Sequence, residues 1–103
     1  MSSQVRSCYD FDAVRFVWDA KKAERNARKH GVSFEEAASA FGDPFALEAA
    51  DLLDPSRTIL IGTSGRSRVL FVVSLHYETS DTVRIISARR ASLAHRRKYE
   101  EAP

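Results

Sequence analysis

The sequence predicts an α+β fold in which one antiparallel β-sheet packs against two N-terminal helices. Three observations lead to this prediction. Two helical segments with clear capping residues follow a short apolar strand, and apolar residues in the second half of the chain follow the two-residue period of β-strands. A short basic helix then ends the chain. The chain has 103 residues, enough for one domain and too few for two. The expected sheet therefore combines an N-terminal strand with a C-terminal meander.

The N-terminal region starts with a polar stretch that predicts little structure. We expect residues 1–13 to be a poorly ordered N-terminal extension and residues 14–103 to form the single domain. A short strand is predicted at residues 14–18. Asp19 is suited to cap a first helix that runs to about His30, and Gly31 can end this helix in the left-handed conformation.

The second helix has a sharper start signal. Ser33 with Glu36 three residues later forms a capping box, in which each side chain satisfies a backbone N–H at the helix start. This helix should run to about Phe41, because residues 42–44, Gly-Asp-Pro, are typical of a helix end.

From residue 45 onward the pattern changes to β-branched and aromatic runs. Strands are predicted at residues 45–49, 58–62, 69–77 and 83–88. The breaks at residues 63–67 and 78–82 have the length of hairpin turns, so the last three strands should form an antiparallel meander. Ser92 then caps a short third helix that reaches about Glu101.

Charge is segregated along the chain, although the formal net charge is only +2. Residues 31–56 contain six carboxylates and no Lys or Arg, whereas residues 82–98 contain six basic residues and no carboxylate. Such segregation favours a basic surface and a phosphate-bearing partner. A solvated helix face would produce the same pattern.

The composition also bears on location. No apolar stretch approaches the roughly 20 residues of a membrane span, and residues 1–7 lack the apolar core of a signal peptide. A single cysteine, Cys8, excludes an internal disulfide and fits a reducing compartment. We therefore expect a cytoplasmic protein without membrane contact.

Arginines on or beside the predicted strands are the main candidates for chemistry. The planar guanidinium grips a phosphate at two points and stabilises extra negative charge on it. Cleavage of RNA by its own 2′-hydroxyl needs little more than this charge stabiliser, a base and an acid. The catalytic candidates are Arg57, Arg84 and Arg89, and the RNA-binding candidates are Arg66, Arg68 and Arg90.

The proton-transfer group is harder to choose. His76 ends the predicted strand at residues 69–77, and imidazole exchanges protons near neutral pH, so it is the first candidate. A surface histidine without a role is the alternative. Glu48 and Tyr99 are weaker options, and Tyr77 or Phe45 could stack on a base. The three histidines lack metal-ligand spacing, so neither a metal site nor a cofactor is expected.

Several segments together resemble the BrnT family of toxins. They cover about nine-tenths of the chain in order: residues 16–22 (FVWDAKK), Asn26, residues 29–37 (KHGVSFEEA), residues 41–44 (FGDP), Arg57, residues 61–62, residues 72–73, residues 84–91 (RIISARRA), Arg96, and residues 99–100. His95 departs from the pattern, because a glutamate is expected at this place in the last helix.

The resemblance implies a RelE-like toxin domain from a type II toxin–antitoxin system. It further implies a metal-independent endoribonuclease that inhibits translation. It also implies that a BrnA-type ribbon-helix-helix antitoxin neutralises the toxin, and that the pair contacts DNA only through this antitoxin. Arg57 and Arg89 match arginines of the family pattern, and Arg84 follows them. The alternative is a non-catalytic module on the same fold that binds nucleic acid or a partner protein without cleavage.

Overall fold

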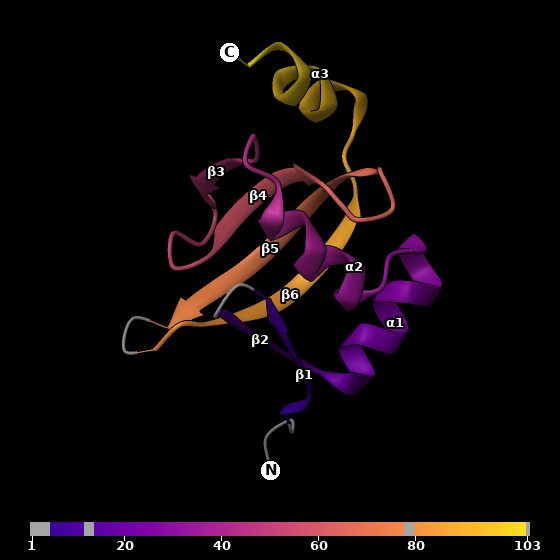
Figure 1. The fold of residues 1–103 in the computed structure, drawn as a ribbon, viewed down its shortest axis with the longest axis vertical. Coiled ribbons are helices and arrows are strands. Elements are labelled where there is room, and N and C mark those ends of the chain that lie inside the picture. The colour runs from indigo at the N-terminus through magenta and orange to yellow at the C-terminus, as the bar shows by residue number, and fades with distance from the viewer. Residues whose placement is uncertain (1–4, 12–13, 78–79, 103) are drawn as a thin grey trace.

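The computed structural model describes residues 14–77 and 80–102, together with the backbone of residues 5–11. Its strands and helices follow one another along the chain as shown in Figure 1: β1 (Val5–Phe11), β2 (Val14–Asp19), α1 (Ala20–His30), α2 (Phe34–Ser39), the 3₁₀ turn η1 (Ala40–Gly42), β3 (Leu47–Ala50), β4 (Thr58–Thr63), β5 (Val69–Tyr77), β6 (Thr82–Arg90) and α3 (Leu93–Glu101). The predicted α+β fold class is confirmed.

One mixed sheet contains all six strands in the order β1-β2-β6-β5-β4-β3. The meander from β3 to β6 is antiparallel, as predicted, but β2 pairs with β6 in parallel over residues 15–17 and 82–84. The prediction of a purely antiparallel sheet is therefore wrong at this pair. Whether β2 runs parallel or antiparallel to β6 depends on where the chain rejoins the sheet after α1 and α2. A local sequence pattern does not encode this position.

Strand β1 occupies a segment for which the sequence predicts poor order. Residues 5–11 pair antiparallel with β2, with Cys8 opposite Val17 and Tyr9 opposite Phe16. Without this pairing β2 would be the edge of the sheet and would expose a row of unpaired N–H and C=O groups. The polar start of the chain and the mixed composition of β1 hide this role from sequence analysis. The remaining residues of the predicted extension, 1–4 and 12–13, lie outside the described residues.

The predicted caps define the helix boundaries, although the capping box at Ser33 is only half formed, because the Glu36 carboxylate binds Arg68 and Ser64 instead of a backbone N–H at the helix start. The Asp19 carboxylate accepts hydrogen bonds from two N–H groups in the first turn of α1, at 2.9 and 3.1 Å. Gly31 ends this helix with φ 71°, a left-handed conformation that favours glycine. Ser33 accepts a hydrogen bond from Glu36 N–H at 3.0 Å, and Ser92 caps α3 in the same way. These local signals predicted all three helix starts correctly.

Helices α1 and α2 cover one face of the sheet and leave the other face without a helical layer along most of its length (Figure 1). Along β5 the buried residues Leu70, Val72 and Ser74 alternate with half-buried Phe71 and Val73. The first set faces the helices, and its Leu70 and Val72 belong to the hydrophobic core. Large side chains of this core are Phe16, Trp18, Phe34, Leu60 and Ile85. We call the side that carries Phe71 and Val73 the open face.

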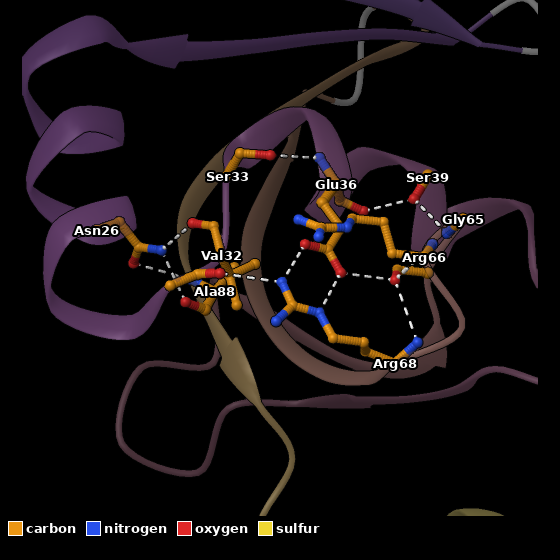
Figure 2. Close-up of polar contacts among 11 residues, drawn as sticks. Asn26, Val32, Ser33, Glu36, Ser39, Gly65, Arg66, Arg68 and Ala88 are labelled. Carbon is orange, nitrogen blue, oxygen red and sulfur yellow. Dashed lines mark hydrogen bonds and ion pairs between the residues drawn. The ribbon is translucent and has the colours of Figure 1, made fainter.

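A single buried amide links α1 to β6. Beyond residue 84, β2 no longer pairs with β6, so the backbone of Ala88 lacks a strand neighbour on that side. The Asn26 side chain takes this place: its Oδ1 accepts from Ala88 N–H at 3.2 Å, and its Nδ2 donates to Ala88 C=O at 2.7 Å and to Val32 C=O at 3.0 Å (Figure 2). Asn26 thus satisfies three buried backbone groups.

A second polar contact joins α2 to the turn between β4 and β5. The Glu36 carboxylate, whose side chain is 3% exposed, accepts from Arg68 Nε at 2.9 Å, from Arg68 Nη2, and from the Ser64 hydroxyl at 2.7 Å (Figure 2). Arg68 Nη2 also donates to the C=O of Gly31 at 2.9 Å. One ion pair therefore connects the end of α1, the start of α2 and the β4–β5 turn.

Replacement of Asn26 by Ala should destabilise the fold by about 3 kcal/mol, because buried backbone groups lose their partners. Urea unfolding monitored by circular dichroism measures this change. Arg28→Ala is the matched control, since Arg28 lies on the same helix with its side chain 72% exposed and pairs with the equally exposed Glu24. The control should change stability by less than about 0.5 kcal/mol. Equal effects of the two variants would contradict the assigned role of Asn26.

Acid should weaken the fold through Glu36. The hydrogen bonds from Arg68 lower the pKa of this carboxyl below its ordinary 4.5, against the opposing effect of burial. Because folding favours the ionised form, its contribution is complete above pH 4.5 and is lost as the pH falls through the lower folded pKa. Glu36→Gln should therefore flatten the acid-dependent loss of stability and should cost about 3 kcal/mol at neutral pH, because Arg68 loses its partner.

Urea unfolding of both proteins between about pH 7 and about pH 3 measures this difference. Glu35→Gln is the control, because Glu35 is exposed on the same helix and should leave the acid dependence unchanged. Parallel stability curves for the wild type and Glu36→Gln would show that the ion pair does not govern acid sensitivity.

Candidate functional site

A β-bulge in β6 brings two of the predicted arginines to the same face of the sheet. Ser74 pairs with Ile85 whereas Val73 pairs with Ser87, so Ile86 is an extra residue on β6. Arg84 and Arg89 are five positions apart and would face opposite sides of a regular strand. With the bulge, both lie opposite residues of the open face of β5, Leu75 and Phe71 respectively.

The ring of Phe71 contacts both the Arg89 guanidinium and the His95 imidazole. The guanidinium carbon of Arg89 lies 4.5 Å from the ring centroid, a cation–π contact. The His95 ring, which comes from α3, lies 4.8 Å from the same centroid with an interplanar angle of 31°. The structure thus places a permanent positive charge and a proton-transfer group around one aromatic ring on the open face.

A shallow groove of about 390 Å³ runs along the open face from this point toward the edge strand β3. Its floor is mostly apolar, and α3 supplies a polar wall with His95 and Lys98. The groove is lined by Leu47, Glu48, Ala49, Ala50, Leu52, Ile59, Ile61, Phe71, His95 and Lys98. An apolar floor beside Lys98 suits a nucleotide, whose base is flat and whose phosphate is anionic.

Helix α3 is held against the sheet by a partly buried cluster of hydrogen bonds. The Tyr99 hydroxyl donates to Asp43 and lies 2.8 Å from the Thr63 hydroxyl, and Thr63 N–H donates to the same carboxylate at 2.8 Å. Burial would raise the pKa of Asp43, but these bonds and one from Phe45 N–H together lower it. Burial and the nearby carboxylate raise the pKa of Tyr99. The cluster thus fixes the helix that carries His95.

The structure does not bring all four catalytic candidates together. His76 lines a different cavity, of about 240 Å³, on the helix side of the sheet, where its ring centroid lies 6.4 Å from that of Phe41. Arg57 lies in the turn before β4 and pairs with Asp54 at 3.3 Å. Only Arg84 and Arg89 share the open face.

The three RNA-binding candidates also differ in their surroundings. The Arg68 guanidinium is bound to Glu36 and its side chain is only 20% exposed, so the geometry gives this residue a structural role. Arg66 is exposed in the β4–β5 turn, and Arg90 is exposed at the end of β6. Tyr99, a weaker acid–base candidate, is engaged with Asp43.

Sequence reasoning missed Phe71 and Lys98, and noted His95 only as a departure from the family pattern. Phe71 looks like a core residue in an apolar run, and only the alternation with buried Leu70 and Val72 hints that it faces the other way. His95 lies 24 positions further along the chain than Phe71, so no local spacing connects them.

Two further observations concern classes of site. Within the described residues, no three His, Cys, Asp or Glu side chains gather as ligands for a metal ion. Among the helices that the structure describes, none has the length and apolar character needed to cross a membrane.

Comparison with known proteins identifies the family. A family model described as "Ribonuclease toxin, BrnT, of type II toxin-antitoxin system" matches residues 18–95. The chain belongs to the BrnT family. The match confirms the resemblance seen in the sequence, and type II toxins of this kind have an antitoxin partner and an RNA substrate. A search of curated protein sequences finds no match.

A solved structure of a BrnT protein has the same fold. The chain is similar to the Brucella abortus ribonuclease toxin BrnT, known from a crystal structure at 1.1 Å resolution, with 25% sequence identity and a TM-score of 0.59. The alignment covers 73% of this chain and 92% of the Brucella protein.

Loss of the Tyr99 hydroxyl should loosen α3. Tyr99→Phe removes a hydrogen bond to a carboxylate, which is worth about 1.5 kcal/mol, so backbone amides of α3 should exchange with solvent roughly tenfold faster. Hydrogen exchange followed by NMR measures this rate. Tyr77→Phe is the control, because the exposed Tyr77 ring lies outside the cluster. Unchanged α3 exchange in Tyr99→Phe would mean that other contacts hold the helix.

Proposed function

We propose that this BrnT-family chain is an endoribonuclease that cleaves RNA without a metal ion, on the open face of its sheet. The observation that carries the proposal is the convergence of Arg89 and His95 on the Phe71 ring, beside a groove with an apolar floor. Arg84 lies on the same face of β6 as Arg89. These groups supply the positive charge and the proton transfer that the reaction requires.

The reaction is a transfer within the RNA itself. The 2′-oxygen attacks the adjacent phosphorus and loses its proton to a base, the bond from phosphorus to the 5′-oxygen breaks, and the 5′-oxygen takes up a proton. The products are a 2′,3′-cyclic phosphate and a free 5′-hydroxyl. Arg84 and Arg89 stabilise the additional negative charge on the phosphate oxygens. His95 exchanges a proton with the 2′-oxygen or with the leaving 5′-oxygen.

This assignment prefers His95 to His76 for a geometric reason. His76 faces the cavity on the helix side, so it and Arg89 would meet a bound RNA strand from opposite faces of the sheet. Arg57 stays a secondary candidate, because its partly exposed pair with Asp54 is weak enough to exchange for a phosphate.

The biological role follows from the family. We propose that cleavage takes place in the cytoplasm and inhibits translation, and that a BrnA-type ribbon-helix-helix antitoxin neutralises the chain and provides all contact of the pair with DNA. The basic open face is a natural surface for an antitoxin to mask, because covering it would exclude RNA.

The purified chain should cut single-stranded RNA in a buffer containing EDTA, and should leave the corresponding DNA intact because DNA lacks the 2′-hydroxyl. Arg89→Gln should slow cleavage by about 10²–10³-fold and His95→Gln by about 10²–10⁴-fold. Gel analysis of labelled RNA, alone and in a cell-free translation reaction, measures these rates. A purified BrnA-type antitoxin should suppress cleavage.

Arg97→Gln is the matched control, because Arg97 lies on the exposed surface of α3 and does not line the groove. His76→Gln separates the two histidines. A large loss of activity in His76→Gln with none in His95→Gln would place the chemistry on the helix side. A chain that binds RNA but leaves it intact in both assays would support the non-catalytic binding module instead.

A further inference from the structure

A third pocket lies at the end of the sheet where β6 leads into α3. It has a volume of about 210 Å³, and three of its lining residues are arginines: it is formed by Ser67, Arg68, Val69, Arg90, Ala91 and Arg96. Ala91 N–H donates to Val69 C=O at 2.9 Å, so two of the lining residues are joined by a backbone hydrogen bond. The lining residues come from the β4–β5 turn, the start of β5, the end of β6 and the start of α3.

The three arginines differ in how firmly they are engaged. Arg68 is neutralised by the buried carboxylate of Glu36. Arg96 pairs with Glu100 at 3.0 Å, but both side chains are more than half exposed, so this pair is weak and exchangeable. Arg90 is exposed and forms no ion pair with any residue that the structure describes. The pocket thus offers one uncommitted guanidinium and one that is readily released.

Ser67 lies in the β4–β5 turn that borders the pocket. It has φ 61°, the one non-glycine residue with positive φ within the described part of the chain. This conformation favours glycine and costs a serine of order 1 kcal/mol. The tight hairpin turn imposes this conformation, because Ser67 N–H donates to Ser64 C=O at 2.9 Å and Ser64 N–H donates to Arg68 C=O at 2.8 Å. The turn places Ser67 at the pocket beside Arg90.

We propose that this pocket binds a phosphate of the RNA backbone next to the cleaved one, through Arg90, Arg96 and the Ser67 hydroxyl. The proposal rests on the proposed function, because it extends the same RNA site. Arg89 and Arg90 are consecutive on β6, and their strand partners Phe71 and Leu70 lie on opposite faces. An RNA strand that contacts both residues therefore passes around the end of β6, between the open face and the pocket.

This arrangement makes binding depend on the length of the RNA. A dinucleotide has one phosphate between its two nucleosides and occupies only the open face. A longer strand also reaches the pocket and gains a second charged contact. Each phosphate contact with a single strand contributes about 0.7 to the slope of log affinity against log salt concentration.

The test uses oligodeoxynucleotides, which carry the same phosphates but lack the 2′-hydroxyl and are not cut. Fluorescence anisotropy should show that Arg90→Gln weakens binding of an octanucleotide about tenfold, lowers its salt slope by about 0.7, and leaves a dinucleotide unaffected. Ser67→Gly relieves the backbone strain, so this variant folds; it should be more stable than wild type and bind the octanucleotide more weakly. Arg97→Gln, on the same helix as Arg96, is the control for general charge.

Each outcome decides the proposal. Equal loss of octanucleotide binding in Arg97→Gln and Arg90→Gln would show a general charge effect and overturn it. The proposal is also overturned if Arg90→Gln weakens binding of the dinucleotide as much as binding of the octanucleotide, or if it weakens only binding of the antitoxin. If wild-type protein cleaves RNA and Arg90→Gln does not change octanucleotide binding, the pocket does not bind a phosphate, while the proposed function stands. If binding depends on Arg90 but no RNA is cut, the pocket stands and the proposed function fails.

Discussion

The buried pair of Glu36 and Arg68 is the contact on which the rest of this structure depends. It joins the end of α1, through Gly31 C=O, and the start of α2 to the β4–β5 turn, which lies about 30 residues further along the chain and also contributes Ser64. Replacement of a buried ion pair by apolar residues is often neutral for stability, whereas loss of one partner is costly. The pair therefore acts mainly as a specificity device that fixes how the helices lie on the sheet.

The arrangement of the helices divides the arginines into two groups. Arg68 forms an ion pair with Glu36 between α2 and the sheet, whereas Arg84 and Arg89 lie on the open face. The same β4–β5 turn that Arg68 anchors also holds Ser67 in its left-handed conformation beside Arg90. An arginine with a structural role thus positions the turn that lies beside Arg90.

The candidate site is assembled from three elements of the chain. Strand β5 supplies Phe71, β6 supplies Arg89, and α3 supplies His95, which reaches the ring because Tyr99 ties the helix to Asp43. No element presents all the required groups. The geometry of the site consequently depends on the docking of α3, and changes in this cluster should act on activity without touching the RNA.

The sequence alone determined the family, the helix boundaries and the course of the central strand, which was predicted at residues 69–77 and found there. These features depend on caps within three residues and on periodic burial, both of which are local. It also identified Arg84 and Arg89, but not that they share a face. Only the tertiary structure decided the bulge at Ile86, the parallel pairing of β2 with β6, the addition of β1 and the approach of His95 to Phe71. Each of these depends on contacts between residues far apart in the chain, which a local pattern does not encode.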